Sequence, residues 1–347
     1  MDELQKTEAR NYLIAGGLLL AGILCLVSVL SGEKFFDATA ISMPCAIGGV
    51  ILLIIGIVLL ALQKRDLAGV SFIIMGAAHF LTVFNTPDSY MVLSLARAAA
   101  LVWGIVLLFS KDKQKWVFAP LSILLGLFYI IRPYSADVSA MGTLLYVVFI
   151  ASAVIAIYFA LAAGFERIRL PGRNLLTSDE TTDFKKAGSS IGYALFGTAV
   201  LCYGLLYCSI PGYSVSGEAI QGLSIGLGLL LILFGILLFA IGKMRFTPVM
   251  FILMGSAEMI ASFSTGPMMY AMGALVIVTG LFAILRKESR ILPGLMLIFY
   301  GVTYFFSAIV GGVVGTPIDS AVLNFIPAAI ALYLAIATLS QRKMPLF

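Results

Sequence analysis

The sequence predicts an all-α integral membrane protein of about twelve transmembrane helices, built as two parallel six-helix repeats. Three observations predict this fold class. The 347-residue chain is 61% apolar and only 11% charged, whereas a soluble protein is closer to a quarter charged. Apolar runs of about 16–24 residues recur along its length, and a helix needs roughly 20 residues to span the hydrocarbon core of a bilayer. A stretch of the first half also recurs in the second.

The predicted spans follow one another with short polar breaks between them. In order they are 11–31, 43–63, 67–86, 91–110, 116–132, 140–163, 190–210, 221–242, 247–265, 267–285, 291–311 and 318–340. The least marked breaks are "KDKQK" (111–115) and "STGPM" (264–268).

Basic residues predict the orientation of these spans. Nineteen of the 22 lysines and arginines fall on the termini and the even-numbered loops, and only Lys34 and Arg132 fall on the odd-numbered loops. Because cytoplasmic loops carry the excess of basic residues, we expect a multi-pass protein of the cell (plasma or cytoplasmic) membrane with both termini in the cytoplasm. The net charge of +5 is then a topology signal, and we expect no nucleic-acid partner.

An internal repeat sets the domain organisation. Shifting the sequence by 179 positions aligns 40–84 with 219–263 without a gap, and 16 of the 45 positions are identical. We therefore predict a first six-helix repeat over 1–163, a cytoplasmic linker over 164–189 and a second repeat over 190–347. An even number of spans gives both repeats the same orientation in the membrane.

Glycines fall in register in the two copies. Since small residues let membrane helices approach closely, they are interpreted as helix-packing positions. The set is Gly49, Gly56 and Gly76 in the first copy, and Gly228, Gly235 and Gly255 in the second.

Three ionisable residues lie inside predicted spans and are the candidate substrate-binding or pore-lining residues: His79, Arg97 and Glu258. His79 is the only histidine of the chain, and Glu258 occupies its position in the second copy. A charge at the centre of a span costs about 2.5–3.5 kcal/mol, so such residues tend to face a bundle interior, a partner or water. His79 and Arg97 could attract a small carboxylate, and a desolvated Glu258 could carry a proton. The structural alternative is that Arg97 reaches the surface, with Glu258 as its counter-ion, while His79 bonds a backbone carbonyl.

Enzyme chemistry is not expected. The chain has no P-loop, HExxH or GxSxG motif, and one histidine with four scattered cysteines cannot build a Cys/His metal site. We therefore expect no catalytic residues, no metal and no cofactor.

Each half resembles the acetate/succinate transporter family of six-helix membrane proteins. The resemblance rests on the closing segments "IYFALAAGFERIRLPG" (157–172) and "LYLAIATLSQRKMP" (332–345), on the short basic turns "QKRD" and "GKMR", and on the six-helix spacing. The family's signature near the first helix is replaced here by "NYLIAGG" and "SIGYALF". The resemblance implies rings of six units that pass small monocarboxylates in step with protons. The family's pore-constricting tyrosine would fall within a residue or two of His79 and Glu258, where this chain has "MGAAHF" and "MGSAEM", and this coincidence favours a pore-lining role for the position. A fused duplicate would form that ring as a homotrimer of pseudo-hexameric shape.

The predicted function is a membrane channel or secondary transporter for a small solute, with a short-chain monocarboxylate such as acetate as the leading candidate and proton coupling as one form of it. Membrane lipid and a small-molecule solute are the expected partners. The alternative is a non-transporting structural or accessory subunit packed against another membrane protein, and a small neutral solute is a third reading. Transport predicts that His79 and Glu258 face a lumen, whereas the accessory reading predicts that helix contacts seal them.

Overall fold

All regular secondary structure is helical in the part of the chain that the structure describes. The structure is a computed structural model, and it describes residues 3–32, 38–62, 66–81, 90–131, 139–164, 171–177, 183–207, 217–244, 246–263, 267–285, 291–310 and 317–340. These residues form thirteen helices, α1 to α13. The all-α prediction is therefore confirmed for this part of the chain.

The chain folds as two compact units, residues 1–187 and 188–347. Their boundary falls inside the predicted linker, 164–189. The first unit contains α1 (Glu3–Gly32), α2 (Ala38–Ala61), α3 (Asp66–Phe80), α4 (Tyr90–Leu108), α5 (Lys115–Ile131), α6 (Ser139–Gly164) and the short α7 (Arg173–Thr177). The second contains α9 (Gly217–Ala240), α10 (Phe246–Phe263), α11 (Pro267–Leu285), α12 (Ile291–Val310) and α13 (Pro317–Ser340), and α8 (Phe184–Tyr207) leads into it.

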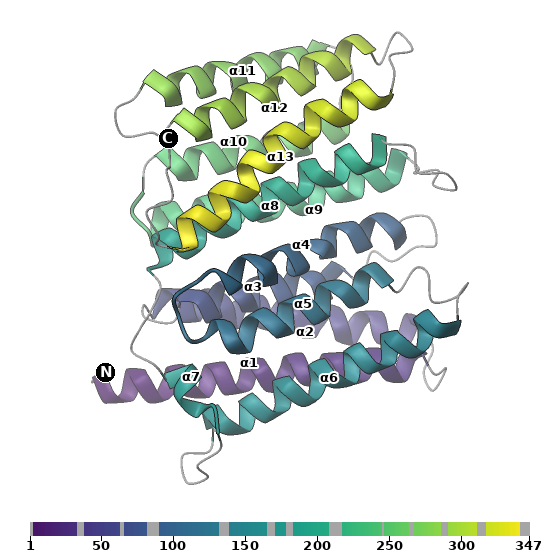
Figure 1. The fold of residues 1–347 in the computed structure, drawn as a ribbon. Helices are drawn as coiled ribbons and strands as arrows, with labels where there is room; N and C mark the ends of the chain where they lie inside the picture. The colour runs from purple at the N-terminus through teal and green to yellow at the C-terminus, as the bar shows by residue number, and fades with distance from the viewer. Residues whose placement is uncertain are drawn as a thin grey trace. The chain divides into compact units, whose positions relative to one another are not determined.

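Each predicted span overlaps one helix of the structure, and the long helices of a unit run alongside one another (Figure 1). Within the described ranges, five helical segments are long and apolar enough to cross a membrane. They are Thr7–Ser28, Met43–Ala61, Thr143–Gly164, Met268–Leu285 and Val322–Ser340. Shorter apolar helical segments lie between them in the chain.

Glycines lie where neighbouring helices approach most closely. In the first unit α2 packs against α3, and a Cβ added to Gly49 would lie 2.6 Å from the carbonyl oxygen of Gly76. In the second unit α9 packs against α10, and a Cβ on Gly228 would lie 2.7 Å from the carbonyl oxygen of Gly255. A Cβ on Gly56 or Gly235 would likewise fall within 3 Å of a carbonyl on the facing helix. Backbones this close leave room for hydrogen only.

Large apolar side chains cover the outward faces of several helices. On α2 the exposed series is Ile47, Ile51, Ile54 and Val58, at the three- and four-residue spacing of one helical face. On α11, Leu285 is 82% exposed. Such faces are unfavourable in water and favourable in lipid, in agreement with the apolar spans.

Polar contacts stabilise the turn between α4 and α5 and join it to α7. The break at 111–115 is a turn in which the backbone N–H of Gln114 donates to the Asp112 carboxylate, 2.9 Å. The Gln114 side-chain amide donates to the carbonyl oxygen of Leu176 in α7, 3.4 Å. Just before α7, Gly172 has φ of +88°, a conformation that favours glycine.

Candidate functional site

His79 lies near the C-terminal end of α3, and its side chain is fully buried. Its Nδ1 is 3.3 Å from the hydroxyl oxygen of Tyr129 in α5. Tyr129 is itself buried. An apolar helix therefore presents its imidazole to a hydroxyl on a neighbouring helix, and not to lipid.

Arg97, on α4, joins the same cluster. Its Nε–H donates to the carbonyl oxygen of Ala78, 3.2 Å, and its guanidinium carbon lies 4.4 Å from the centre of the Tyr129 ring. A cation over an aromatic face at this distance is attracted by the ring quadrupole. We call His79, Arg97 and Tyr129 the basic cluster; it is built from three helices of the first unit.

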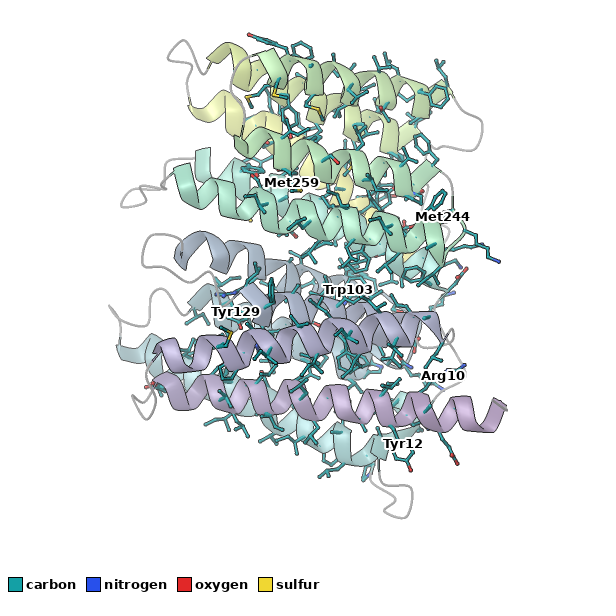
Figure 2. All side chains as sticks on the ribbon, turned by 180° about the vertical axis from the view of Figure 1, so that it is seen from behind. Arg10, Tyr12, Trp103, Tyr129, Met244 and Met259 are labelled. Atoms are coloured by element: carbon teal, nitrogen blue, oxygen red, sulfur yellow. The ribbon has the colours of Figure 1, made fainter. Side chains whose placement is uncertain are left out.

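Aromatic rings pack around and beside the basic cluster. Phe128 contacts Tyr129 edge to face, with ring centres 5.0 Å apart. Further along α4, the indole N–H of Trp103 donates to the hydroxyl of Ser71 in α3, 3.1 Å. Figure 2 shows Tyr129 and Arg10 toward opposite ends of the first unit. The basic cluster thus lies far from the N-terminal end of α1, which bears Arg10.

Glu258 lies in α10 and is ringed by hydroxyl groups of the second unit. Its Oε1 accepts a hydrogen bond from the hydroxyl of Tyr300 in α12, 2.5 Å. The Tyr300 and Tyr304 hydroxyls are 2.7 Å apart. Tyr203 of α8 hydrogen-bonds to Glu258 and to the hydroxyl of Ser224 in α9. We call these five residues the acidic cluster.

The structure therefore brings two of the three predicted residues together. His79 and Arg97 share the basic cluster of the first unit, while Glu258 belongs to the second unit and hydrogen-bonds to tyrosines there. The prediction that Glu258 is the counter-ion of Arg97 stays a prediction.

All three residues are buried. The exposed fraction is 0% for His79, 1% for Arg97 and 1% for Glu258. In this conformation the three side chains are enclosed by helix contacts, so the prediction that they line a pore stays a prediction and requires another conformation.

The tyrosines of the basic and acidic clusters were not predicted from the sequence. A shared spacing would have found two of them: "GLFY" (126–129) in α5 and "GVTY" (301–304) in α12 place a tyrosine three residues after a glycine. Tyr129 and Tyr304 are those residues. Tyr203 and Ser224 carry no comparable sequence signal.

Chemically, the two clusters differ. A guanidinium, an imidazole and a hydroxyl together can bind an anion, whereas a carboxyl with hydroxyl donors can hold a proton. Among the described residues, no three histidine, cysteine, aspartate or glutamate side chains gather as metal ligands.

Comparison with known protein families, with curated proteins and with solved structures finds no match to this chain. Its function is therefore inferred from the two clusters and from the sequence.

Proposed function

We propose that this chain is a secondary transporter of a short-chain monocarboxylate such as acetate, held in the cell membrane by twelve helices in two six-helix repeats. One observation carries the proposal: the basic cluster places the Arg97 guanidinium, 1% exposed, among apolar helices beside His79 and Tyr129. An ionisable residue inside a membrane span marks a functional site by default, because its insertion is costly.

The groups of the basic cluster suit a carboxylate. A guanidinium presents a planar fork of N–H donors that matches the two carboxylate oxygens. The Tyr129 hydroxyl and the His79 ring supply further hydrogen-bonding atoms within 3.3 Å of each other. Phe128, packed on Tyr129, offers an apolar surface to the short alkyl group of the same solute.

Burial of the cluster favours a transporter over an open channel. A channel needs its lining residues in contact with water, whereas a transporter alternates access around an enclosed site. Because His79 and Arg97 are enclosed, the conformation described here would be an occluded one. Solute entry then requires movement of α3, α4 or α5.

Matching helix contacts support the duplication that the sequence predicts. A shift of 175 positions aligns the closely packed glycines of α1 with those of α8. The earlier shift of 179 aligns Phe72 with Phe251. For each pair of aligned glycines, a Cβ added to either glycine would contact the corresponding residue of a neighbouring helix. The pairs are Gly17 with Phe72 and Gly192 with Phe251, and Gly22 with the Ala153 carbonyl and Gly197 with the Ala328 carbonyl.

The distribution of basic residues extends the proposal to topology, and the family resemblance extends it to assembly. Both termini face the cytoplasm, and three chains form a ring of six units. Native mass spectrometry of the detergent-solubilised protein measures the second point, and a mass other than that of a trimer contradicts it.

The test is uptake of labelled acetate into liposomes that contain the purified protein, under an inward proton gradient. We expect Arg97→Gln to abolish uptake above the level of empty liposomes, because it removes the charge and the fork of donors. The matched control is Arg10→Gln, which changes another buried arginine of the same unit, one that donates to the carbonyl oxygen of Leu62 (2.8 Å) outside the basic cluster. Uptake by this control should stay within twofold of the unaltered protein.

Two results would contradict the proposal. No uptake by the unaltered protein above empty liposomes rules out acetate transport. Equal uptake by Arg97→Gln and Arg10→Gln rules out the basic cluster as the solute site.

The second candidate is a non-transporting subunit of a membrane complex. The enclosure of His79, Arg97 and Glu258 is what that function predicts. A cysteine at position 79 in a chain without its native cysteines separates the two. Reaction of this cysteine with a membrane-impermeant thiol reagent under turnover conditions supports transport, and no reaction under any gradient supports the subunit.

A further inference from the structure

The acidic cluster of the second unit draws its polar groups from four helices: Tyr203 from α8, Ser224 from α9, Glu258 from α10, and Tyr300 and Tyr304 from α12. The acidic cluster shares no residue with the basic cluster of the first unit. Its carboxyl is 1% exposed, so whatever neutralises it must come from the protein or be bound there.

The described part of the second unit places no cation near Glu258. Among the described side chains of residues 188–347, Lys243 is the only lysine or arginine, and it lies in the turn before α10. Glu258 lies twelve residues after Phe246, the first residue of α10, which puts roughly 18 Å of helix between that turn and the carboxyl. The groups that face Glu258 are hydroxyls: Tyr203 from α8, and Tyr300 with Tyr304 behind it from α12.

The second unit also lacks a counterpart of Arg97. Aligning Gly104 of α4 with Gly280 of α11 brings Arg97 onto Gly273. A Cβ on Gly273 would already lie 2.9 Å from the Phe305 ring and 3.0 Å from the carbonyl oxygen of Gly301, so the packing excludes a long side chain at this position. A carboxyl without a charged partner in an apolar interior is costly as an anion.

The oxygen–oxygen distances in the acidic cluster are those of hydrogen bonds. The Tyr300 hydroxyl is 2.5 Å from Glu258 Oε1 and 2.7 Å from the Tyr304 hydroxyl. Even Mg²⁺, with octahedral oxygens at about 2.0–2.1 Å, holds adjacent ligand oxygens about 2.9 Å apart. These oxygens of the acidic cluster therefore lie at the spacing of shared hydrogens, closer together than the ligands of a bound Mg²⁺.

Each hydroxyl has a single proton, which fixes the direction of the hydrogen bonds. Tyr300 donates its proton to Glu258, so Tyr304 must donate to Tyr300. If Tyr203 likewise donates to Glu258, then Ser224 must donate to Tyr203. Two hydroxyl relays therefore converge on the carboxylate when it is ionised.

We propose that Glu258 is a proton-binding site and that loading the proton reverses the relay through Tyr203 and Ser224. This proposal depends on the proposed function in one respect: it makes the second unit the half of a monocarboxylate transporter that carries the proton. The proton adds to a carboxylate oxygen of Glu258, whose new O–H donates to the Tyr203 oxygen. Tyr203 then donates to Ser224, and Ser224 to a carbonyl one turn earlier in α9. Hydroxyls of this chain already donate to carbonyls four residues back at Ser28, Ser71, Ser152 and Thr198.

The experiment is infrared difference spectroscopy of the full chain in lipid vesicles, recorded between acid and alkaline pH without any solute. We expect one C=O band of a buried carboxylic acid that disappears as the pH rises, shifts in D₂O and is absent from Glu258→Gln. The matched control is Glu8→Gln, the same change at an exposed side chain, which must keep the band.

A second variant keeps the proposal testable if Glu258→Gln does not fold. Tyr203→Phe removes one donor to the carboxylate, and a bond to the charged form is stronger than one to the neutral acid. The band should then persist to a pH about one unit higher, a tenfold gain in proton affinity.

The outcomes separate this proposal from the proposed function. A band that survives in Glu258→Gln, a Tyr203→Phe spectrum with unchanged pH dependence, or a band that disappears on adding Na⁺ at constant pH overturns the proton site. Because the spectra need no transport, a proton band in a protein that does not take up acetate would refute only the transport proposal.

Discussion

The closest backbone approach beside the basic cluster gives the sharpest prediction. Gly126 of α5 faces Leu101 of α4, and a Cβ at position 126 would lie 2.3 Å from the backbone nitrogen of Leu101 and 2.6 Å from its Cα. Gly126 comes three residues before Tyr129, and Leu101 four residues after Arg97. Gly126→Ala must therefore separate α4 and α5 within one turn of the cation–aromatic contact.

The structure sets the size of the effect. An ordinary carbon contact is about 3.5–4.0 Å, so the helices must part by more than 1 Å. Overpacking of this kind costs about 1–3 kcal/mol, and the value belongs at the upper end because the clash is with backbone. Replacing a helical glycine by alanine returns about 1 kcal/mol. The net destabilisation is about 2 kcal/mol.

The matched control is Gly16→Ala in α1, where an added Cβ would meet nothing within 4 Å. It should stabilise the protein by about 0.5–1 kcal/mol. Unfolding in increasing fractions of sodium dodecyl sulfate is followed by tryptophan fluorescence, which reports on the first unit because both tryptophans, Trp103 and Trp116, lie there. Equal stabilities for the two variants, or a stabilised Gly126→Ala, would refute the reasoning.

Three further changes test other contacts. Lys243 is exposed and has φ of 51°, so Lys243→Gly should raise the free energy of unfolding by about 1 kcal/mol, while an alanine there gives no such gain. Trp103→Phe removes the donor to Ser71 (3.1 Å) and should lower it by about 1 kcal/mol, measured by circular dichroism on heating. Ser190→Ala loses the bond to the carbonyl oxygen of Ala335 (2.7 Å); it should cost about 1 kcal/mol by the same melt, and unchanged tryptophan fluorescence would place the effect in the second unit.

The helices were predictable because long apolar runs leave the chain few alternatives. Each predicted span overlaps one helix, and the break predicted at 111–115 lies at the turn between α4 and α5. The candidate site was predictable in part. A lone histidine and arginine in apolar spans are conspicuous, and His79 and Arg97 do meet. That they meet over Tyr129 depends on how α5 is rotated against α3 and α4.

Tyrosines are poor signals in a membrane sequence. With 14 tyrosines and 24 phenylalanines in the chain, an aromatic residue marks a helix face, a packing contact or a membrane interface equally well. The role of Tyr300 follows only from its hydroxyl being 2.5 Å from Glu258, and that of Tyr203 from contacts between α8, α9 and α10. Such contacts depend on tertiary register, which apolar periodicity does not contain.

Several residues change together between the two clusters. In the alignment that the proposed duplication gives, His79 corresponds to Glu258, Arg97 to Gly273 and Tyr129 to Tyr304.

In the same alignment two more positions differ, and both carry a phenol in the second unit. Leu125 corresponds to Tyr300, and Ser28, which is 3.8 Å from the Cys45 sulfur, corresponds to Tyr203, which bonds to Ser224. Where the first unit has Arg97, the aligned position in the second unit is a glycine, and the two additional phenols can donate the hydrogen bonds that a buried carboxyl requires. One substitution at position 258 would leave those donors facing the wrong group, so the two units differ as whole sites and not at a single residue.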